Sequence, residues 1–466
     1  MSTVYAHFIG VGGAGMSGIA RVLHDRGILV TGSDMKDSRY ARSLATSGMQ
    51  VTIGHAAENL GDPEIVVVSS AIPETNPELA EARRRGIDVW PRAKMLAHVG
   101  RDSKTLAVAG THGKTTTSSM LATTIAGMGL DPTFLIGGEL NDMGANARCG
   151  KGDYYVVEAD ESDGSFLFLD PYLALVTNIE ADHLDHYSGI DEVVATFGEF
   201  LGNVREGGIA VVCADDARLP ALAREHVNGR VVTYGLADDA EVRCTGLRAE
   251  GIGHTFSVRF PDGQHFDAQI GVPGIHMVVN ATGVLGAIWA LGLDVSGAVA
   301  PLAGFTGVHR RFEKVGEVGG VSVVDDYAHH PTEVRATLAA AKAAGFERVW
   351  VVFQPHRYSR TAALGDDFGA AFPDADHVVL MDVYSAGEAP IPGVSGKTIL
   401  DALLDVAPHA AAAYFPHRAD VCGYLGSRVR RGDLVMTMGA GDVTAMAGEL
   451  VRELENRFEA EPVSCR

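Results

Sequence analysis

The stretch that decides the fold is Ser103-Lys104-Thr105-Leu106-Ala107-Val108-Ala109-Gly110-Thr111-His112-Gly113-Lys114-Thr115-Thr116-Thr117. It predicts a buried strand that ends at Ala109, a tight glycine turn, and a helix that runs from Thr115 to Gly127. The N-terminus of a helix offers free N–H groups and the positive end of the helix dipole, so a phosphate group binds well there. Lys114 would then contact the β- and γ-phosphates of a nucleotide, and the Thr115 hydroxyl would bind Mg²⁺.

This loop is shorter than the general phosphate-binding loop. The general pattern places a glycine at the position where this chain has Val108. The alternative interpretation is a glycine-rich turn that binds nothing. We favour phosphate binding, because Gly113, Lys114 and Thr115 follow one another in the mechanistic order between a strand and a helix.

A second glycine loop lies near the N-terminus. The strand Tyr5–Ile9 leads into Gly10-Val11-Gly12-Gly13-Ala14-Gly15, and a helix from Met16 to His24 follows. A second strand ends at Asp34, which completes the G-x-G-x-x-G fingerprint with its acidic residue. The fingerprint predicts a nucleotide pyrophosphate over the helix start and a ribose near Asp34, and it does not specify the nucleotide. A turn without a ligand is the alternative.

Composition and charge narrow the class of protein. A length of 466 residues suggests about three domains. The 59 acidic and 38 basic residues leave a net charge of −21, which argues against nucleic-acid binding, because such proteins carry basic patches. Five scattered cysteines without a Cys-x-x-Cys pair are typical of a cytoplasmic protein with reduced thiols. The uncharged segment between Asp267 and Asp294 contains Pro273 and Asn280, so we expect a buried helix there and no membrane span.

Acidic segments follow two further predicted strands. Tyr154–Val157 is followed by Glu158–Asp163, and Leu173–Ile179 is followed by Glu180–His186. Ligands of parallel sheets bind beyond the carboxyl ends of the strands, so we expect Thr115 and both segments to converge. Carboxylate and hydroxyl oxygens suit a hard cation that bridges phosphates, and a histidine can join a second metal ion. The alternative is that these acids are solvated loop residues.

The remainder predicts an insertion and a third α/β series. From Ala240 to Pro273 the pattern changes to antiparallel strands around a turn, and Gly304–Glu313 has the composition of a hinge. The fold class is therefore α/β with three domains. They are a Rossmann-like N-terminal domain (residues 1–101), a central P-loop ATPase-like domain with an antiparallel insertion (102–309) and a C-terminal Rossmann-like domain (310–466).

Four arginines at the hinge and after a strand of the third series are candidates to clamp phosphate or carboxylate groups. They are Arg310, Arg311, Arg357 and Arg360. Each of them can equally form a surface ion pair.

Together these motifs resemble the Mur ligase family, and within it the branch that adds L-alanine. The resemblance covers nearly the whole chain. It rests on the segments His7–Gly18, Ala109–Thr116, Glu158–Asp163, Asn178–His183, Asp325–Pro331 and Gln354–Thr361. The short ATP loop is characteristic of this family, which accounts for the glycine missing at Val108.

The resemblance implies an amide ligase of peptidoglycan precursor synthesis. In this family ATP phosphorylates the lactyl carboxylate of UDP-N-acetylmuramate, and the amine of L-alanine attacks the acyl phosphate. The implied cofactors are ATP and Mg²⁺, with two ions. The implied partners are the two small-molecule substrates, with no nucleic acid and no membrane, and the implied protein is a cytoplasmic monomer or homodimer.

The resemblance also implies site residues. The ATP site would comprise Gly110, Thr111, His112, Gly113, Lys114, Thr115, Thr116 and Asn280. The UDP-sugar site would comprise Gly10, Gly12, Gly13, Ala14, Gly15, Met16, Ser17, Asp34 and Ser70. The metal ligands would be Thr115 and Glu158 for one ion and His183 for a second. The catalytic set would be Lys114, His183, Arg311 and Asp326, and the residues facing substrate carboxylates would be Arg357 and Arg360.

Two positions depart from the family pattern. The family motif His-Asn-x-x-Asn reads His276-Met277-Val278-Val279-Asn280 here, so Met277 replaces a polar residue. Sister ligases carry a carbamylated lysine after the Asp-His motif, and Thr196–Phe200 contains no lysine. The alanine-adding branch is expected to lack that lysine, and Glu199 is a candidate to replace its charge.

Three alternatives remain open at this point. The nearest is murein peptide ligase, which joins a whole peptide to the same nucleotide sugar. An NAD-dependent dehydrogenase would use the first glycine loop, although it leaves the second loop unexplained. A non-catalytic nucleotide-binding regulator is the third.

Overall fold

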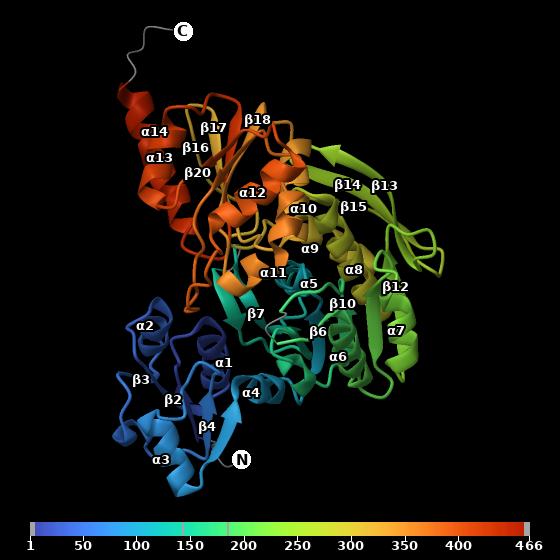
Figure 1. Cartoon of the computed structure of the whole chain (residues 1–466). Coiled ribbons are helices and arrows are strands. Elements are labelled where there is room, and N and C mark those ends of the chain that lie inside the picture. The colour runs from blue at the N-terminus through green and yellow to red at the C-terminus, as the bar shows by residue number, and fades with distance from the viewer. Residues whose placement is uncertain (1–4, 142–143, 184–185, 461–466) are drawn as a thin grey trace. The chain divides into compact units, whose positions relative to one another are not determined.

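The computed structural model describes residues 5–141, 144–183 and 186–460. These residues divide into two compact units. The first runs up to Thr245 and includes Ser257–Ala268 and Val279–Phe305, and the second comprises Gly246–Phe256, Gln269–Val278 and the chain from Thr306 onward. Three separate β-sheets with flanking helices account for the architecture (Figure 1), so the predicted three-domain α/β fold class is confirmed.

The N-terminal sheet is fully parallel, in the order β3-β2-β1-β4-β5. Its elements are β1 (Tyr5–Ile9), α1 (Ala14–Asp25), β2 (Leu29–Asp34), α2 (Arg39–Thr46), β3 (Gln50–Ile53), η1 (Ala57–Leu60), β4 (Ile65–Val68), α3 (Pro77–Arg85), β5 (Asp88–Pro91) and α4 (Arg92–Val99). The strand order reverses between β1 and β4. The glycine loop after β1 therefore lies at a topological switch point, where α/β folds bind their ligands.

The central sheet has ten strands in the order β15-β14-β13-β12-β11-β10-β6-β9-β7-β8. Its elements are β6 (Lys104–Ala109), α5 (Lys114–Gly127), β7 (Thr133–Leu140), β8 (Ala145–Arg148), β9 (Tyr154–Glu158), η2 (Ser165–Phe168), β10 (Leu173–Val176), α6 (Ile190–Gly202), β11 (Ile209–Cys213), α7 (Leu219–His226), β12 (Arg230–Gly235), β13 (Val242–Glu250), β14 (Gly253–Arg259), β15 (His265–Ile270), α8 (Ile275–Ala290) and α9 (Val295–Ala303).

Strand β6 lies in the middle of this sheet, between β9 and β10. Residues 105–109 are all buried, as expected for a parallel strand covered on both faces. The loop from Gly110 to Gly113 and the start of α5 therefore lie at the carboxyl edge, next to the ends of β9 and β10.

The predicted insertion is present, but it is not a separate subdomain. Strands β13, β14 and β15 are neighbours in chain order and continue the central sheet beyond β12. A β7–β8 hairpin that the sequence did not predict forms the opposite edge. Gly137 and Gly138 interrupt the apolar residues of β7. The strand therefore lacks the alternating apolar pattern by which strands are predicted from sequence, and it was missed.

The C-terminal sheet has the order β16-β17-β21-β18-β19-β20, with β16 antiparallel to β17. Its elements are β16 (Glu313–Val318), β17 (Val321–Asp326), α10 (Pro331–Ala343), β18 (Arg348–Phe353), α11 (Tyr358–Gly369), β19 (His377–Leu380), α12 (Gly396–Val406), β20 (Ala412–Tyr414), α13 (Arg418–Gly426), β21 (Asp433–Met438) and α14 (Thr444–Ala460). Two buried clusters cover its two faces, around Val351 on one and Val352 on the other.

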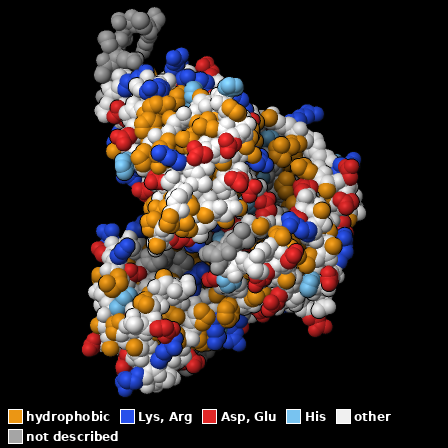
Figure 2. All heavy atoms as spheres, viewed as in Figure 1, with side chains coloured by type: hydrophobic (Ala, Val, Ile, Leu, Met, Phe, Trp, Pro, Cys, Tyr) orange, Lys and Arg blue, Asp and Glu red, His pale blue; other side chains and the backbone are white. Residues whose placement is uncertain are grey.

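Two surface features bear on the predicted partners. On the face drawn in Figure 2, basic side chains are interspersed with acidic ones. Within the described part of the chain, no helix combines the length and the apolar character needed to cross a membrane.

Candidate active site

The central glycine loop has the geometry of a phosphate cradle. Helix α5 begins at Lys114, its N-cap Gly113 has φ +82°, and no side chain caps the helix. Its first N–H groups are therefore available to an anion. At Gly110, a Cβ would lie 2.0 Å from Oγ1 of Thr177, so only glycine allows the loop to pass the end of β10.

Lys114 lies folded into this loop. Its Nζ donates to the carbonyl oxygens of Gly110 at 2.7 Å and Thr111 at 3.0 Å, and to Oε1 of Glu161 at 2.7 Å. Burial opposes the charged form, but Glu161 and Asp160 outweigh it and raise the pKa of Lys114. The loop therefore contains a fixed positive charge at the position where the phosphates are expected.

The predicted pair of metal ligands is in contact. The Thr115 hydroxyl donates to Oε1 of Glu158 at 2.9 Å, and the Gly137 N–H donates to Oε2 at 2.7 Å. A Cβ at Gly137 would lie 2.8 Å from that oxygen. A hydroxyl and a carboxylate side by side at a helix N-terminus fit Mg²⁺ chemically, because this ion takes one or two protein oxygens together with phosphate oxygens.

His183 completes a second group of side chains. Its Nε2 lies 3.8 Å from Oε1 of Glu161 and 3.7 Å from Oδ2 of Asp182. Burial raises the pKa of Glu161 to about 7, in spite of the Lys114 charge. His183 has φ +53°, an uncommon backbone conformation for a non-glycine residue. The structure thus brings Thr115, Glu158–Asp163 and Glu180–His183 to one edge of the sheet, as predicted, and residues 184 and 185 of the second segment lie outside the described residues.

Asn178 is a supporting residue to which the sequence interpretation assigned no role. Its Oδ1 accepts the His112 N–H at 2.8 Å, and its Nδ2 donates to the His112 carbonyl at 3.0 Å. The Thr111 hydroxyl accepts the Glu180 N–H at 2.8 Å. These bonds fasten the phosphate loop to the end of β10. The available signal in the sequence was a polar asparagine at the carboxyl end of the predicted apolar strand Leu173–Ile179.

Asn280, the predicted adenine contact, lies on α8 beside the loop. A Cβ at Gly113 would approach its side-chain amide to 3.2 Å. Met277, on the same helix, is buried, as its apolar side chain requires. Glu199 is exposed on α6, which does not favour it as a substitute for the missing lysine charge.

The N-terminal glycine loop is held against the end of β2. The N–H groups of Gly10 and Val11 donate to the Ser33 carbonyl, and the Gly12 N–H donates to Oδ2 of Asp34 at 2.9 Å. Helix α1 begins at Ala14 without a side-chain cap. Asp34 therefore shapes the loop in addition to lying where the ribose is expected.

The other predicted UDP-sugar residues differ in their surroundings. Met16 is buried, and the Ser17 hydroxyl donates to the Ala14 carbonyl, so both can offer a ligand mainly their backbone groups. Ser70 is exposed beyond β4. Gly13 is the N-cap of α1, and Gly15 lies in the first turn of that helix.

Arg92 is a cation that the sequence interpretation missed. A Cβ at Gly15 would lie 3.0 Å from its Nη1, so the guanidinium rests on the first turn of α1. Its charge also contributes to the lowered pKa of Asp160, where burial acts in the opposite direction. Arg92 follows a proline at the start of α4, and that position gave no functional signal.

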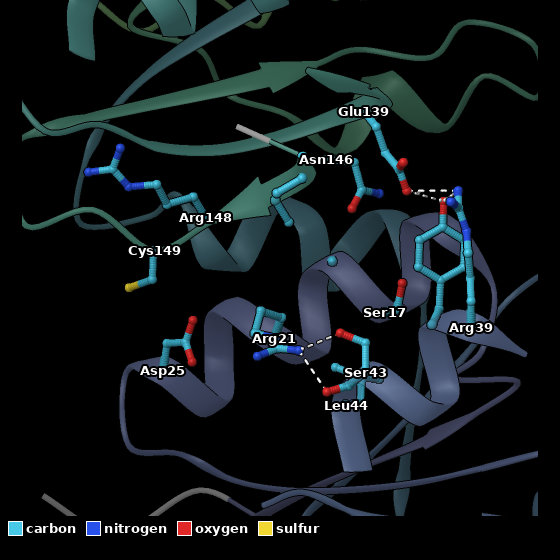
Figure 3. Close-up of a pocket in the computed structure, with 15 residues that line it drawn as sticks. Ser17, Arg21, Asp25, Arg39, Ser43, Leu44, Glu139, Asn146, Arg148 and Cys149 are labelled. Atoms are coloured by element: carbon cyan, nitrogen blue, oxygen red, sulfur yellow. Dashed lines mark hydrogen bonds and ion pairs between the residues drawn. The ribbon is translucent and has the colours of Figure 1, made fainter. Parts of the chain in front are cut away.

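A cavity of 470 Å³ is lined by residues of α1, of α2 and of the β7–β8 hairpin (Figure 3). Arg39 lies 2.7 Å from Glu139, and Arg21 donates to the carbonyl and hydroxyl of Ser43. Arg148 pairs with Asp131. Each lining guanidinium thus already has an acceptor, so we assign no ligand to this cavity.

The contact between α1 and the β7–β8 hairpin also explains why residue 18 is a glycine. A Cβ at Gly18 would lie 2.9 Å from Leu135 and 3.0 Å from Ala147. Asn146 also donates from its side chain to the Ala14 carbonyl at 3.1 Å. Gly18 therefore serves the packing of α1 on the hairpin.

In the second unit, the predicted hinge is pinned to the end of β17. Arg310 has φ +62° and donates from Nε to Oδ2 of Asp325 at 3.1 Å. Its Nη2 donates to the Gly439 carbonyl at 2.6 Å. The hydroxyls of Thr437 and Thr444 also donate to Asp325, so this buried carboxylate is fully occupied. Arg310 is thus a structural anchor.

Asp326 holds two backbone N–H groups, one directly after Arg311 and one two residues after Asp326 itself. It accepts the N–H groups of Phe312 and Ala328, each at 2.7 Å. Phe312 has φ +49°, a strained conformation for a bulky residue. Burial raises the pKa of Asp326 to about 6, against the lowering effect of Arg311. Arg311 lies over the Tyr327 ring and 3.7 Å from Glu333.

Arg357 and Arg360 frame the start of α11. Arg357 has φ +69° and its N–H donates to the Tyr384 carbonyl at 2.8 Å. Burial, assisted by the charges of Arg360 and Arg357, lowers the pKa of His356 to about 4. Two cations and a neutral imidazole therefore gather at the carboxyl end of β18.

Family models cover the chain in three parts. The description "Mur ligase family, catalytic domain" matches residues 5–104, "Mur ligase middle domain" matches residues 108–288, and "Mur ligase, glutamate ligase domain" matches residues 310–441. These spans correspond to the three sheets.

Curated relatives match over nearly their full length. UDP-N-acetylmuramate–L-alanine ligase of Pelotomaculum thermopropionicum is 46% identical over 97% of this chain and 98% of its own length. The protein of that name from Rubrobacter xylanophilus is 49% identical over 96% and 99%. A crystal structure of UDP-N-acetylmuramate-alanine ligase from Thermotoga maritima superposes with a TM-score of 0.80, at 27% identity over 97% of this chain and 99% of that one. The chain belongs to the Mur ligase family.

Proposed function

We propose that this chain joins L-alanine to the lactyl carboxylate of UDP-N-acetylmuramate in an ATP-dependent reaction of peptidoglycan precursor synthesis. The relatives that match it end to end carry the name of that activity. The observation that carries the proposal is the pairing of Thr115 with Glu158 and of Lys114 with Glu161 at the uncapped start of α5. An NAD-dependent dehydrogenase has no use for this arrangement.

In the first step, a carboxylate oxygen attacks the γ-phosphorus of ATP, and ADP leaves. Catalysis of such a step is mainly positioning and neutralisation of charge. Lys114 would hold the β- and γ-phosphates, the loop from Gly110 to Gly113 would cradle them, and Asn280 would meet the adenine. Mg²⁺, when bound by Thr115 and Glu158 and by His183 at a second position, would neutralise charge on the phosphates.

In the second step, the neutral amine of L-alanine attacks the acyl carbon. The nitrogen of the tetrahedral intermediate loses a proton to solvent, the C–O bond to the phosphate breaks, and the amide and inorganic phosphate are released. Arg357 and Arg360 would hold the negative charges of the two substrates, and planar guanidinium groups suit carboxylates for this purpose. Arg311, whose backbone is fixed by Asp326, would complete the catalytic set.

The nucleotide sugar would lie on the N-terminal domain. Its pyrophosphate would meet the N–H groups at the start of α1, next to the loop Gly10–Gly15. Arg92 on this first helical turn supplies a matching positive charge, although the protein as a whole is acidic. The proposal places the reaction in the cytoplasm, with the protein as a monomer or homodimer and with two small molecules as its partners besides ATP.

Phosphate release tests this function. The purified protein is assayed with ATP, Mg²⁺, UDP-N-acetylmuramate and either L-alanine or the tripeptide L-alanyl-γ-D-glutamyl-meso-diaminopimelate. We expect release that depends on both the nucleotide sugar and L-alanine. A preference for the tripeptide would instead establish a murein peptide ligase.

A further inference from the structure

One buried carboxylate beside the phosphate loop is only half satisfied. The Glu161 side chain is 2% exposed. Its Oε1 accepts from Nζ of Lys114 at 2.7 Å, whereas its Oε2 has no hydrogen-bond partner among the described residues and is shielded from solvent. Burial of a carboxylate oxygen is costly unless a donor or a cation compensates the lost hydration. The position of Oε2 therefore favours a further positive group beside Glu161.

His183 lies next to the same carboxylate. Its Nε2 is 3.8 Å from Oε1 of Glu161. Two ligand atoms that each lie about 2.1 Å from one octahedral ion are about 3.0 Å apart when adjacent and about 4.2 Å apart when opposite. The observed distance falls between these limits. The imidazole and the carboxylate are therefore spaced as two ligands of one ion.

Tyr187 fixes the backbones of both residues. Its N–H donates to the His183 carbonyl at 2.9 Å, and its hydroxyl donates to the Glu161 carbonyl. The Gly164 N–H donates to the same Glu161 carbonyl at 3.0 Å. The positive φ of His183 is thus held by its surroundings, as strained backbone at functional sites usually is. Two side chains from the ends of β9 and β10 are positioned together by these bonds.

Two other carboxylates suit a shared ion less well. Oδ2 of Asp182 lies 3.7 Å from Nε2 of His183, but its Oδ1 accepts the His183 N–H at 2.7 Å, so this side chain shapes the turn. Glu199, the candidate from the sequence to replace the missing lysine charge, is exposed on α6. Glu161 alone among these three combines full burial with an oxygen that has no partner in the described part of the chain.

Lys114 cannot serve Glu161 and ATP at the same time. In this structure its Nζ binds Glu161 and two loop carbonyls, whereas the proposed reaction needs the same ammonium on the β- and γ-phosphates. A buried carboxylate that loses its cation is strongly destabilising. A divalent ion at Glu161 would compensate this charge when Lys114 turns to the phosphates.

We propose that Glu161 is a ligand of the second metal ion, which its carboxylate and the imidazole of His183 hold together. Carboxylate and imidazole groups suit ions such as Mn²⁺. An ion bound there would supply positive charge beside the transferred phosphate. The inference rests on the proposed function, which places a second ion at His183.

The test counts Mn²⁺ bound to the full-length protein. Electron paramagnetic resonance detects free Mn²⁺, whose sharp spectrum is lost on binding, in a titration with one equivalent of adenylyl imidodiphosphate, a non-hydrolysable analogue of ATP. The wild type should bind two ions. In Glu161→Gln the affinity for the second ion should fall by about 100-fold or more, because a lost ligand costs at least as much as a lost outer partner. The first ion, at Thr115 and Glu158, should remain.

Glu199→Gln is the matched control, because it makes the same acid-to-amide change at an exposed position. It should bind two ions with wild-type affinities. Asp182→Asn tests the other carboxylate near His183. Retention of both ions in Glu161→Gln, or loss of the second ion in Asp182→Asn together with its retention in Glu161→Gln, would overturn the inference.

A second variant keeps the test decisive if Glu161→Gln does not fold. Glu161→Asp retains the charge and withdraws the carboxylate by one methylene, so the second ion should bind about tenfold or more weakly, and an unchanged affinity would overturn the inference. A wild type that binds the analogue with a single ion would overturn the inference and leave the proposed function to the phosphate-release assay. Failure to bind the analogue at all would overturn both.

Discussion

The Thr115 hydroxyl donates to Oε1 of Glu158 at 2.9 Å, which joins the first turn of α5 to the end of β9. Because the Gly137 N–H occupies the other carboxylate oxygen, Glu158 is oriented before any substrate arrives. A metal ligand with its side chain already fixed loses little entropy on binding.

Replacing Glu158 by glutamine tests this orientation. The amide preserves the shape of the side chain and removes its negative charge, so we expect kcat to fall by about 100-fold or more and the Mg²⁺ requirement to rise. Phosphate release measured across a Mg²⁺ titration gives both values. Glu199→Gln, a change at an exposed acid on α6, should behave as wild type. A wild-type Mg²⁺ response in Glu158→Gln would remove Glu158 from the metal site.

A methyl group at Gly137 should produce a similar defect without removing any ligand. The new Cβ would lie 2.8 Å from Oε2 of Glu158, which is closer than real Cβ contacts, so the carboxylate must move. We expect Gly137→Ala to weaken Mg²⁺ activation by about tenfold while the protein stays folded. Gly423→Ala, which meets open space, serves as the control. Normal activation in Gly137→Ala would show that the carboxylate tolerates the displacement.

Variants of Lys114 and Glu161 should show separate effects on turnover and on thermal stability. Lys114→Ala removes the cation beside Glu161, whose buried carboxyl must then take up a proton, so the variant should lose stability and turnover should be abolished. Adding Glu161→Gln should recover most of the melting temperature and none of the activity. Calorimetry and phosphate release on the single and double variants check both effects. Activity in the double variant would refute the role of Lys114.

Asp326→Asn probes the hinge. The amide nitrogen would face one of two N–H groups that the carboxylate now accepts, those of Phe312 and Ala328. The strained backbone at Phe312 then loses its support, and we expect turnover to fall by about tenfold or more, with ATP affinity within about threefold of wild type. Asp366→Asn on the exposed side of α11 is the control. Unchanged turnover in Asp326→Asn would mean that the hinge holds its shape without this carboxylate.

Acid should reveal the hydrogen-bond network of Glu78, a buried residue on α3 whose carboxylate accepts from His7, Ser33 and Asn59. The folded-state pKa of about 2 is below the ordinary value of 4.5, so the stabilisation is fully present above pH 4.5 and is lost as the pH falls toward 2. The shift corresponds to about 3 kcal/mol. Melting temperatures of the wild type and Glu78→Gln should therefore differ by a constant amount between pH 5 and 7 and converge toward pH 3. A constant difference down to pH 3 would contradict the low pKa.

The sequence predicted those parts of the fold and site that depend on local patterns. Lys114 and Thr115 follow the loop Gly110–Gly113 after one apolar strand, and Glu158 ends another. Parallel topology alone brings strand ends together, so their proximity was predictable. Their roles as ligands stay predictions. The β7–β8 hairpin was missed because two glycines break its alternation.

Other features depend on tertiary contacts that no local pattern shows. Arg92 reaches Gly15 only because α4 returns to the start of α1. Glu78 is an ordinary first-turn acid in the sequence, and it becomes the centre of a network because His7 and Ser33 point at the same face of the sheet. The strain at Arg310 and Phe312 is likewise visible only in the backbone angles.

The central claim is that the γ-phosphate of ATP passes through the carboxylate of the nucleotide sugar. The most direct measurement uses UDP-N-acetylmuramate labelled with ¹⁸O in both lactyl carboxylate oxygens, with ATP and L-alanine, and mass spectrometry of the products. The account predicts one ¹⁸O atom in each inorganic phosphate and one in the new alanyl amide. Unlabelled phosphate, or ATP hydrolysis without an amide product, would contradict it.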